Sequence, residues 1–147
     1  MGAAGGLSVR SGGSEPALRR FLDTNVLIYS VSKDARGVRA ITVIRDGGLI
    51  SVQVLNEFTH VARNKLRHPW PAIEAAITRF RIALGPVVSL TVETHAAALV
   101  RSRDHGFGIF DGLIVTSAIE AGCTELLTED LQDGRVIDGL TIRNPFA

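Results

Sequence analysis

The chain has little cysteine, few aromatic side chains and almost no net charge. Its single cysteine, Cys123, excludes a disulfide within the chain, and its place after Gly122 in an apolar stretch predicts a small buried residue. A protein without disulfides fits a reducing compartment, so we expect a cytoplasmic location. No apolar run reaches the roughly 18 to 20 residues that a membrane span needs, so no membrane partner is expected.

The charge balance excludes a global basic field. Sixteen basic and 15 acidic residues leave a formal net charge of +1, so any attraction for nucleic acid must come from local patches. Basic side chains that could flank a phosphate site, or simply line a solvated helix face, are Arg36, Arg39, Arg63, Lys65 and Arg67. Aromatic residues make up only 5% of the chain, so we expect no stacking platform for single strands.

What the chain does contain is typical of one globular domain. Its apolar fraction is 46%, and 147 residues are enough to bury a substantial core. The Gly- and Ser-rich start lacks the apolar stretch of a signal peptide. We therefore predict a disordered tail over residues 1–17, to which we assign no function, and a single domain over residues 18–147.

Short apolar runs alternate with segments of helical period. We predict strands over 18–22, 49–52, 87–90, 124–128 and 140–142. The predicted helices begin near Asn25, which could cap the first, and then cover 41–45, 53–66, 70–84, 94–105 and 111–120. In the helix over 70–84, apolar residues from Trp70 to Leu84 recur at helical spacing, which favours core packing over a contact with a second copy or an antitoxin. The alternation predicts an α/β sandwich with a mostly parallel sheet.

Four acidic residues lie beside these predicted strands and helix starts: Asp23, Glu57, Asp111 and Asp130. In a parallel sheet, strand ends and helix starts meet at one edge, where ligands bind. We therefore expect the four carboxylates to gather there. A carboxylate beside a core segment is costly to desolvate unless it is paired or holds a metal, so the set predicts a Mg²⁺ site for phosphodiester chemistry.

Each acid also has an ordinary structural explanation. Asp23 could belong to a turn or cap, Glu57 could be a favourable charge early in a helix, and Asp111 could be a simple N-cap. Asp130 could form a turn with Asp133 and Gly134, and Glu129 competes with it for the role of ligand. Asp133 is a possible outer ligand.

Two further side chains could support the acids. Thr128 and Asn25 could hydrogen-bond the inner carboxylates, although a strand end and a helix cap explain them as well. The chain shows no convincing Ser/His/Asp or Cys/His arrangement, so a covalent nucleophile is not expected.

At these residues the chain resembles the PIN-domain family, and within it the VapC-type toxin ribonucleases. The resemblance is carried in register by four stretches: Phe21–Tyr29, Ile50–Phe58, Gly106–Ile114 and Leu127–Leu131. Each motif alone is weak, but their shared order and spacing cover residues 20 to about 145. Two positions depart from the family pattern, because Gly112 replaces the usual Ala after the third acid and Phe110 replaces the usual Tyr before it.

The resemblance implies a three-layer α/β/α sandwich around a mostly parallel sheet of four or five strands. It implies an endoribonuclease dependent on Mg²⁺ or Mn²⁺, usually a homodimer, that is blocked by a small antitoxin protein. Asp23, Glu57, Asp111 and Asp130 match the family's acidic positions, with Asn25 and Thr128 at supporting ones. The alternatives are a catalytically inactive PIN domain that binds RNA or antitoxin, and a structure-specific DNA nuclease.

Overall fold

The computed structural model describes residues 19–147, so the predicted tail over residues 1–17 lies outside the described part of the chain. The elements follow in the order β1 (Arg20–Leu22), α1 (Thr24–Ser30), α2 (Gly37–Arg45), α3 (Val52–Asn64), α4 (Trp70–Ala83), α5 (Val92–His105), α6 (Ile109–Glu120), β2 (Glu125–Leu127), β3 (Val136–Ile137) and β4 (Leu140–Arg143). None of the helices within residues 19–147 combines the length and apolar character that crossing a membrane demands.

The sheet has the strand order β1-β2-β4-β3. β1, β2 and β4 run parallel, with Phe21 opposite Leu126 and Leu126 opposite Ile142. The apolar side chains of these strands are buried in the core. This arrangement confirms the predicted α/β fold with a mostly parallel sheet.

The antiparallel strand β3 was not predicted. It pairs with β4 through a two-residue turn in which Asp138 and Gly139 both have positive φ. An Asp-Gly pair with these dihedrals is a strong hairpin signal, because its twist matches that of the flanking strands. The strand itself is only two residues long, too short to give a periodic pattern.

The predicted strands over 49–52 and 87–90 are reduced to single bridges. Leu49 pairs with Phe21 and Val88 pairs with Ser51, both in parallel. The first segment is cut short because Ser51 caps α3, accepting a hydrogen bond from the Val54 amide, so the helix begins at once. The two segments still extend the sheet beyond β1 by backbone hydrogen bonds.

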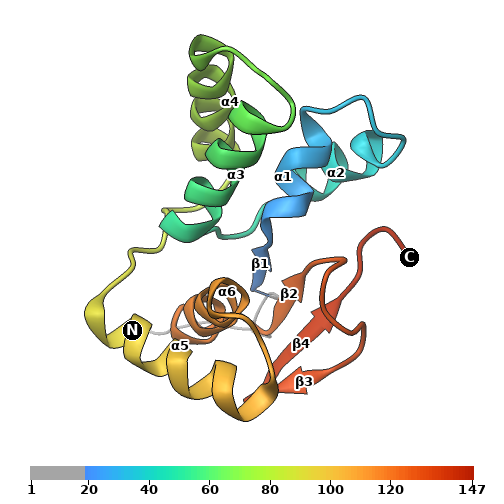
Figure 1. Cartoon of the computed structure of the whole chain (residues 1–147). Coiled ribbons are helices and arrows are strands. Elements are labelled where there is room, and N and C mark those ends of the chain that lie inside the picture. Colours follow the sequence, from blue (N-terminus) through green and yellow to red (C-terminus); the bar gives the residue numbers. More distant parts are fainter. Residues whose placement is uncertain (1–18) are drawn as a thin grey trace, which may run out of the picture.

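The helices form two groups (Figure 1). α5 and α6 lie together, with α6 against β2 and β4, and α1 to α4 form a second group on the other side of β1. α6 is buried along most of its length, because its sequence is apolar on most sides. Two helix predictions were wrong in detail: α2 begins at Gly37, one turn before Ile41, and Trp70 is exposed at the start of α4.

Gly112 lets α5 and α6 approach closely. A Cβ at this position would lie 2.1 Å from the Ser102 hydroxyl oxygen and 3.0 Å from the Ala98 carbonyl oxygen, both on α5. Ser102 and Ala98 on α5 therefore occupy the space that an Ala side chain at position 112 would need. The Ser102 hydroxyl fills the space and donates a hydrogen bond to the Gly108 carbonyl oxygen.

We predict that Gly112→Ala destabilises the protein by about 1 kcal/mol, because overpacking outweighs the gain in helix propensity. In a Ser102→Ala background the same change should cost less, because the closest contact is removed and that with the Ala98 carbonyl oxygen remains. Urea unfolding of the four proteins gives the coupling energy, which we expect to be about 1 kcal/mol. Additive effects of the two substitutions would contradict this account of the contact.

Candidate active site

Asp23 lies where β1 ends and α1 begins, and both its backbone and its side chain form hydrogen bonds to neighbouring elements. Its amide donates to the Leu127 carbonyl oxygen at the end of β2, with an N···O distance of 3.0 Å. One carboxylate oxygen accepts from the Thr24 amide at 2.6 Å and caps α1. The other accepts from the Thr128 hydroxyl at 2.7 Å. Asp23, rather than Asn25, is therefore the cap of this helix.

The environment of Asp23 disfavours its negative charge. The residue is only 3% exposed, and this burial raises the pKa of its carboxyl to about 7. The hydrogen bonds from Thr128 and Thr24 act in the opposite direction, whereas the nearby charges of Asp130 and Asp111 raise the pKa further. A cation beside Asp23 would offset this penalty.

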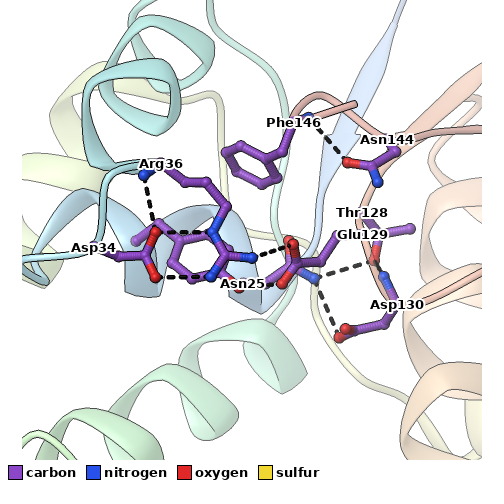
Figure 2. Close-up of polar contacts among 9 residues, drawn as sticks. Asn25, Asp34, Arg36, Thr128, Glu129, Asp130, Asn144 and Phe146 are labelled. Carbon is purple, nitrogen blue, oxygen red and sulfur yellow. Dashed lines mark hydrogen bonds and ion pairs between the residues drawn. The ribbon is translucent and has the colours of Figure 1, made fainter.

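Thr128 and Asn25 connect Asp23 to Asp130, and Figure 2 shows the part of this network that joins Asn25, Thr128 and Asp130. The Thr128 hydroxyl donates to Asp23 and accepts from both the Asn25 side-chain amide and the Asp130 backbone amide. The Asn25 amide also donates to the Asp130 carboxylate at 3.2 Å. The supporting positions predicted from the sequence are thus directly bonded to two of the four acids.

Glu129 is held away from this network (Figure 2). One of its carboxylate oxygens accepts from the Tyr29 hydroxyl, and the other pairs with the Arg36 guanidinium at 2.9 Å. Arg36 also forms a two-pronged ion pair with Asp34 and lies over the Tyr29 ring. Because both oxygens are engaged, Asp130 is the better candidate of the two neighbouring acids. Because Arg36 is paired with both Asp34 and Glu129, it is less available to contact a phosphate beside the site.

Glu57 and Asp111 lie near enough to the other acids for their negative charges to repel, but they form no hydrogen bond with them. Burial raises the pKa of both carboxyls; Asp111 and Asp130 repel the charge of Glu57, and Asp130 repels that of Asp111. Glu57 lies in the second turn of α3 and accepts from the Gln53 side-chain amide at 2.9 Å. Asp111 is the third residue of α6, whose N-cap is Gly108, so the N-cap explanation for Asp111 does not hold.

The donor set suits a hard divalent cation, but the four acids are not in chelating contact. Within residues 19–147, no three His, Cys, Asp or Glu side chains are grouped closely enough to hold a metal as they stand. Like charges keep such side chains apart, and a cation would have to draw them together. Two buried oxygens beside Asp23, Thr24 Oγ1 and Asn25 Oδ1, lack hydrogen-bond partners in this part of the chain. Carboxylate and amide oxygens are ligands that Mg²⁺ prefers.

Gln53 and Tyr29 contact the acids of this region but were not predicted from the sequence. Gln53 could have been found, because it lies four residues before Glu57 and therefore on the same helix face. Tyr29 reaches Glu129 across 100 residues of sequence, and no local pattern signals such a contact. The possible outer ligand Asp133 accepts from the Asn144 backbone amide.

Comparison with known proteins identifies the family. The family model described as the PIN domain matches residues 20–136, so the chain belongs to the PIN-domain family. No curated protein gives a significant sequence match.

Solved structures with the same fold include toxins of toxin–antitoxin pairs. VapC20 from Mycobacterium tuberculosis, described as a sarcin–ricin loop cleaving toxin, has a TM-score of 0.61 and 21% identity, covering 76% of this chain and 91% of that one. VapBC2 from Rickettsia felis, bound to a promoter DNA fragment, has a TM-score of 0.62 and 19% sequence identity. A toxin–antitoxin complex from Klebsiella pneumoniae has a TM-score of 0.63 and 17% sequence identity. Both of the latter cover 86% of this chain and 98% of the matched chain. At these identities the likeness establishes the fold.

The raised pKa of Asp23 predicts a pH-dependent stability when divalent metal is absent. Between its ordinary pKa of 3.8 and the folded value of about 7, the native state binds a proton that the unfolded state has released. Stability should therefore fall as pH rises through this window. From pH 5 to pH 8 in EDTA, we expect wild type to lose about 2–3 kcal/mol relative to Asp23→Asn.

Urea unfolding of both proteins across this pH range measures the difference. The two proteins are compared by the slope of their free energy of unfolding against pH. Their absolute stabilities differ, because Asn cannot accept both hydrogen bonds of Asp23 and the variant loses some stability at every pH. Adding Mg²⁺ at pH 8 should stabilise wild type more than the variant. If the free energy of unfolding changed with pH in the same way for both proteins, the raised pKa of the buried Asp23 carboxyl would be contradicted.

Proposed function

We propose that this PIN domain is a metal-dependent endoribonuclease and the toxin of a toxin–antitoxin pair. The observation that carries the proposal is the buried Asp23 carboxyl, surrounded by the charges of Asp111 and Asp130 and linked to Asp130 through Thr128 and Asn25. A pocket that gathers negative groups at an energetic cost is the arrangement that a divalent cation stabilises.

In this proposal Asp23, Glu57, Asp111 and Asp130 hold Mg²⁺ or Mn²⁺. When bound, such an ion polarises a phosphate oxygen and lowers the pKa of water, so that hydrolysis needs no covalent nucleophile. The Thr128 hydroxyl orients Asp23, and the Asn25 amide orients Asp130. The pair between Arg36 and Glu129 keeps the adjacent carboxylate out of the site.

The antitoxin partner is proposed by analogy with the Rickettsia and Klebsiella complexes, which contain one. RNA as substrate is supported by the printed description of VapC20 as a toxin that cleaves the sarcin–ricin loop. A homodimer and a cytoplasmic location complete the proposal. The buried thiol of Cys123 is consistent with a reducing compartment.

We predict that purified protein cleaves labelled RNA in Mg²⁺ or Mn²⁺ and that EDTA stops the reaction. Asp23→Asn and Asp111→Asn should each lower the cleavage rate by more than about 100-fold, because each removes a charged ligand from the site. The matched control is Asp104→Asn, which removes an exposed carboxylate paired only with its neighbour Arg103 and should cleave like wild type.

The same experiment separates the alternatives. Binding of RNA without cleavage in any metal would favour an inactive RNA-binding domain, and cleavage restricted to branched or flapped DNA would favour a structure-specific DNA nuclease. Wild-type rates in both site variants would refute the assigned site. Circular dichroism of each variant excludes unfolding as the cause of lost activity.

We also predict a specific requirement for the Thr128 hydroxyl. Thr128→Val keeps the shape of the side chain but removes the bonds to Asp23, Asn25 and the Asp130 amide, and we expect a 10- to 100-fold loss in metal affinity or activity. Thr128→Ser retains the hydroxyl and should stay close to wild type. Titration calorimetry with Mn²⁺ measures the affinity directly, and equal affinities for the Val and Ser variants would contradict the role.

A further inference from the structure

Three adjoining pockets follow the exposed face of α3 away from the acids. The first, of about 520 Å³, opens between Glu57 and Phe110. It shares Asn56 and His60 with a second pocket of about 480 Å³, which reaches Arg63 and Trp70. The third shares Arg63 with the second and ends at Arg67. Together they make a path, here called the α3 path, that starts at a candidate catalytic residue.

Two exposed aromatic rings lie on the α3 path. Phe110, directly before Asp111, is 60% exposed, and Trp70 is 51% exposed. The helical spacing of apolar residues predicts Trp70 on a core-packing face, and the low aromatic content predicts no stacking platform. Both rings are instead open to solvent, and the faces of exposed aromatic rings are where unpaired bases stack.

The far end of the α3 path is positively charged. The Arg63 guanidinium lies over one face of the Trp70 ring, 4.8 Å from its centre, and donates to the His68 carbonyl oxygen, which holds it in place there. Neither Arg63 nor Arg67 forms an ion pair within residues 19–147. Both charges are therefore available to a phosphate.

Arg67 occupies a backbone conformation that suits glycine better. Its φ of 60° is in the left-handed region, just after the end of α3, where a side chain carries an energetic cost. Glycine would relieve this cost, so the arginine side chain stands here at the expense of local stability. Such an outlier on a solvent-exposed path points to a binding role.

We propose that the α3 path binds the single-stranded segment of RNA on one side of the cleaved bond. One base stacks on Phe110 and another on the face of Trp70 that Arg63 does not cover, while Arg63 and Arg67 contact the phosphates between and beyond them. Glu57 and Arg63 are six residues apart on α3, or about 9 Å along its axis. The inference rests on the proposed function, since it assigns the substrate a direction away from the acids.

Charge favours RNA over a second copy of the chain as the occupant. A two-fold contact through this face would bring Arg63 and Arg67 near the same cations of the partner, without acids on the path other than Glu57 to offset them. A polyanion meets no such repulsion.

Tryptophan fluorescence can detect a base that stacks on Trp70, because Trp70 is the only tryptophan of the chain. The experiment uses full-length Asp23→Asn in EDTA, so that RNA is not cut, and titrates a short unstructured single-stranded RNA. We expect quenching of tryptophan fluorescence on binding, and a smaller effect with double-stranded DNA of the same length.

The variants give distinct results. Arg63→Ala should weaken binding about tenfold and reduce the salt dependence of log Kd by about 0.7, the loss of one phosphate contact. Arg67→Gly should raise Tm yet weaken RNA binding, a combination that a purely structural role would not produce. Phe110→Ala should also weaken binding about tenfold, through lost stacking. The matched control is Arg81→Ala on α4, which should bind like the parent.

Failure of this inference is distinguishable from failure of the proposed function. If wild type cleaves RNA but the Trp70 fluorescence and the Arg63 and Arg67 variants show no effect, the α3 path is refuted while the ribonuclease stands. If RNA quenches Trp70 as expected but wild type never cleaves, the path stands and the enzymatic proposal fails. Quenching that depends on protein concentration alone would mean that copies of the chain meet at this face, and would overturn the inference.

Discussion

The burial of the Asp23 carboxylate is the interaction on which the rest of the structure depends. The same residue ends β1, bonds to the end of β2 through its amide, and caps α1 with its side chain. The sheet edge, the first helix and the candidate site are therefore fixed by one residue. Each hydrogen bond that Asp23 accepts lowers its pKa, but burial outweighs them.

This arrangement makes the site a local source of instability. Three carboxyl groups, those of Asp23, Glu57 and Asp111, have raised pKa values for the same first cause, desolvation. A fold selected only for stability would replace them with apolar residues or pair them with arginine. Arg36 in fact pairs with Glu129 and leaves Asp130 to the network of Asn25 and Thr128. Such uncompensated charge is typical of sites that bind a cation.

Much of this could be predicted from the sequence, because it follows from rules about neighbouring residues. Asp23 and Asp130 follow apolar runs, and the carboxyl ends of parallel strands share an edge, so their proximity was predictable. The α/β class followed from the alternation of strand and helix patterns. The helix starts at Glu57 and Asp111 point to the same edge, and the resemblance to PIN domains supports the same grouping of four acids. The site assignment itself stays a prediction.

The missed features depend on contacts between distant residues. The Arg36–Glu129 pair joins positions 93 residues apart, and the exposure of Trp70 depends on where α4 packs. The short strand β3 lacked length, although its Asp138-Gly139 turn was a readable signal. The start of α2 at Gly37 was missed because glycine is a poor helix former.

The basic residues show why a net charge of +1 says little about partners. Arg36 is tied to Asp34 and Glu129, and Arg39 donates to the Pro145 carbonyl oxygen, so two of the five predicted flanking cations serve the fold. Arg63 and Arg67 have no acidic partner within residues 19–147 and lie on the α3 path, which begins at Glu57. A polyanion responds to the local field at short range, because salt screens charges beyond about 10 Å. A nearly neutral chain can therefore bind phosphates where its cations are unpaired and its acids are occupied by a metal.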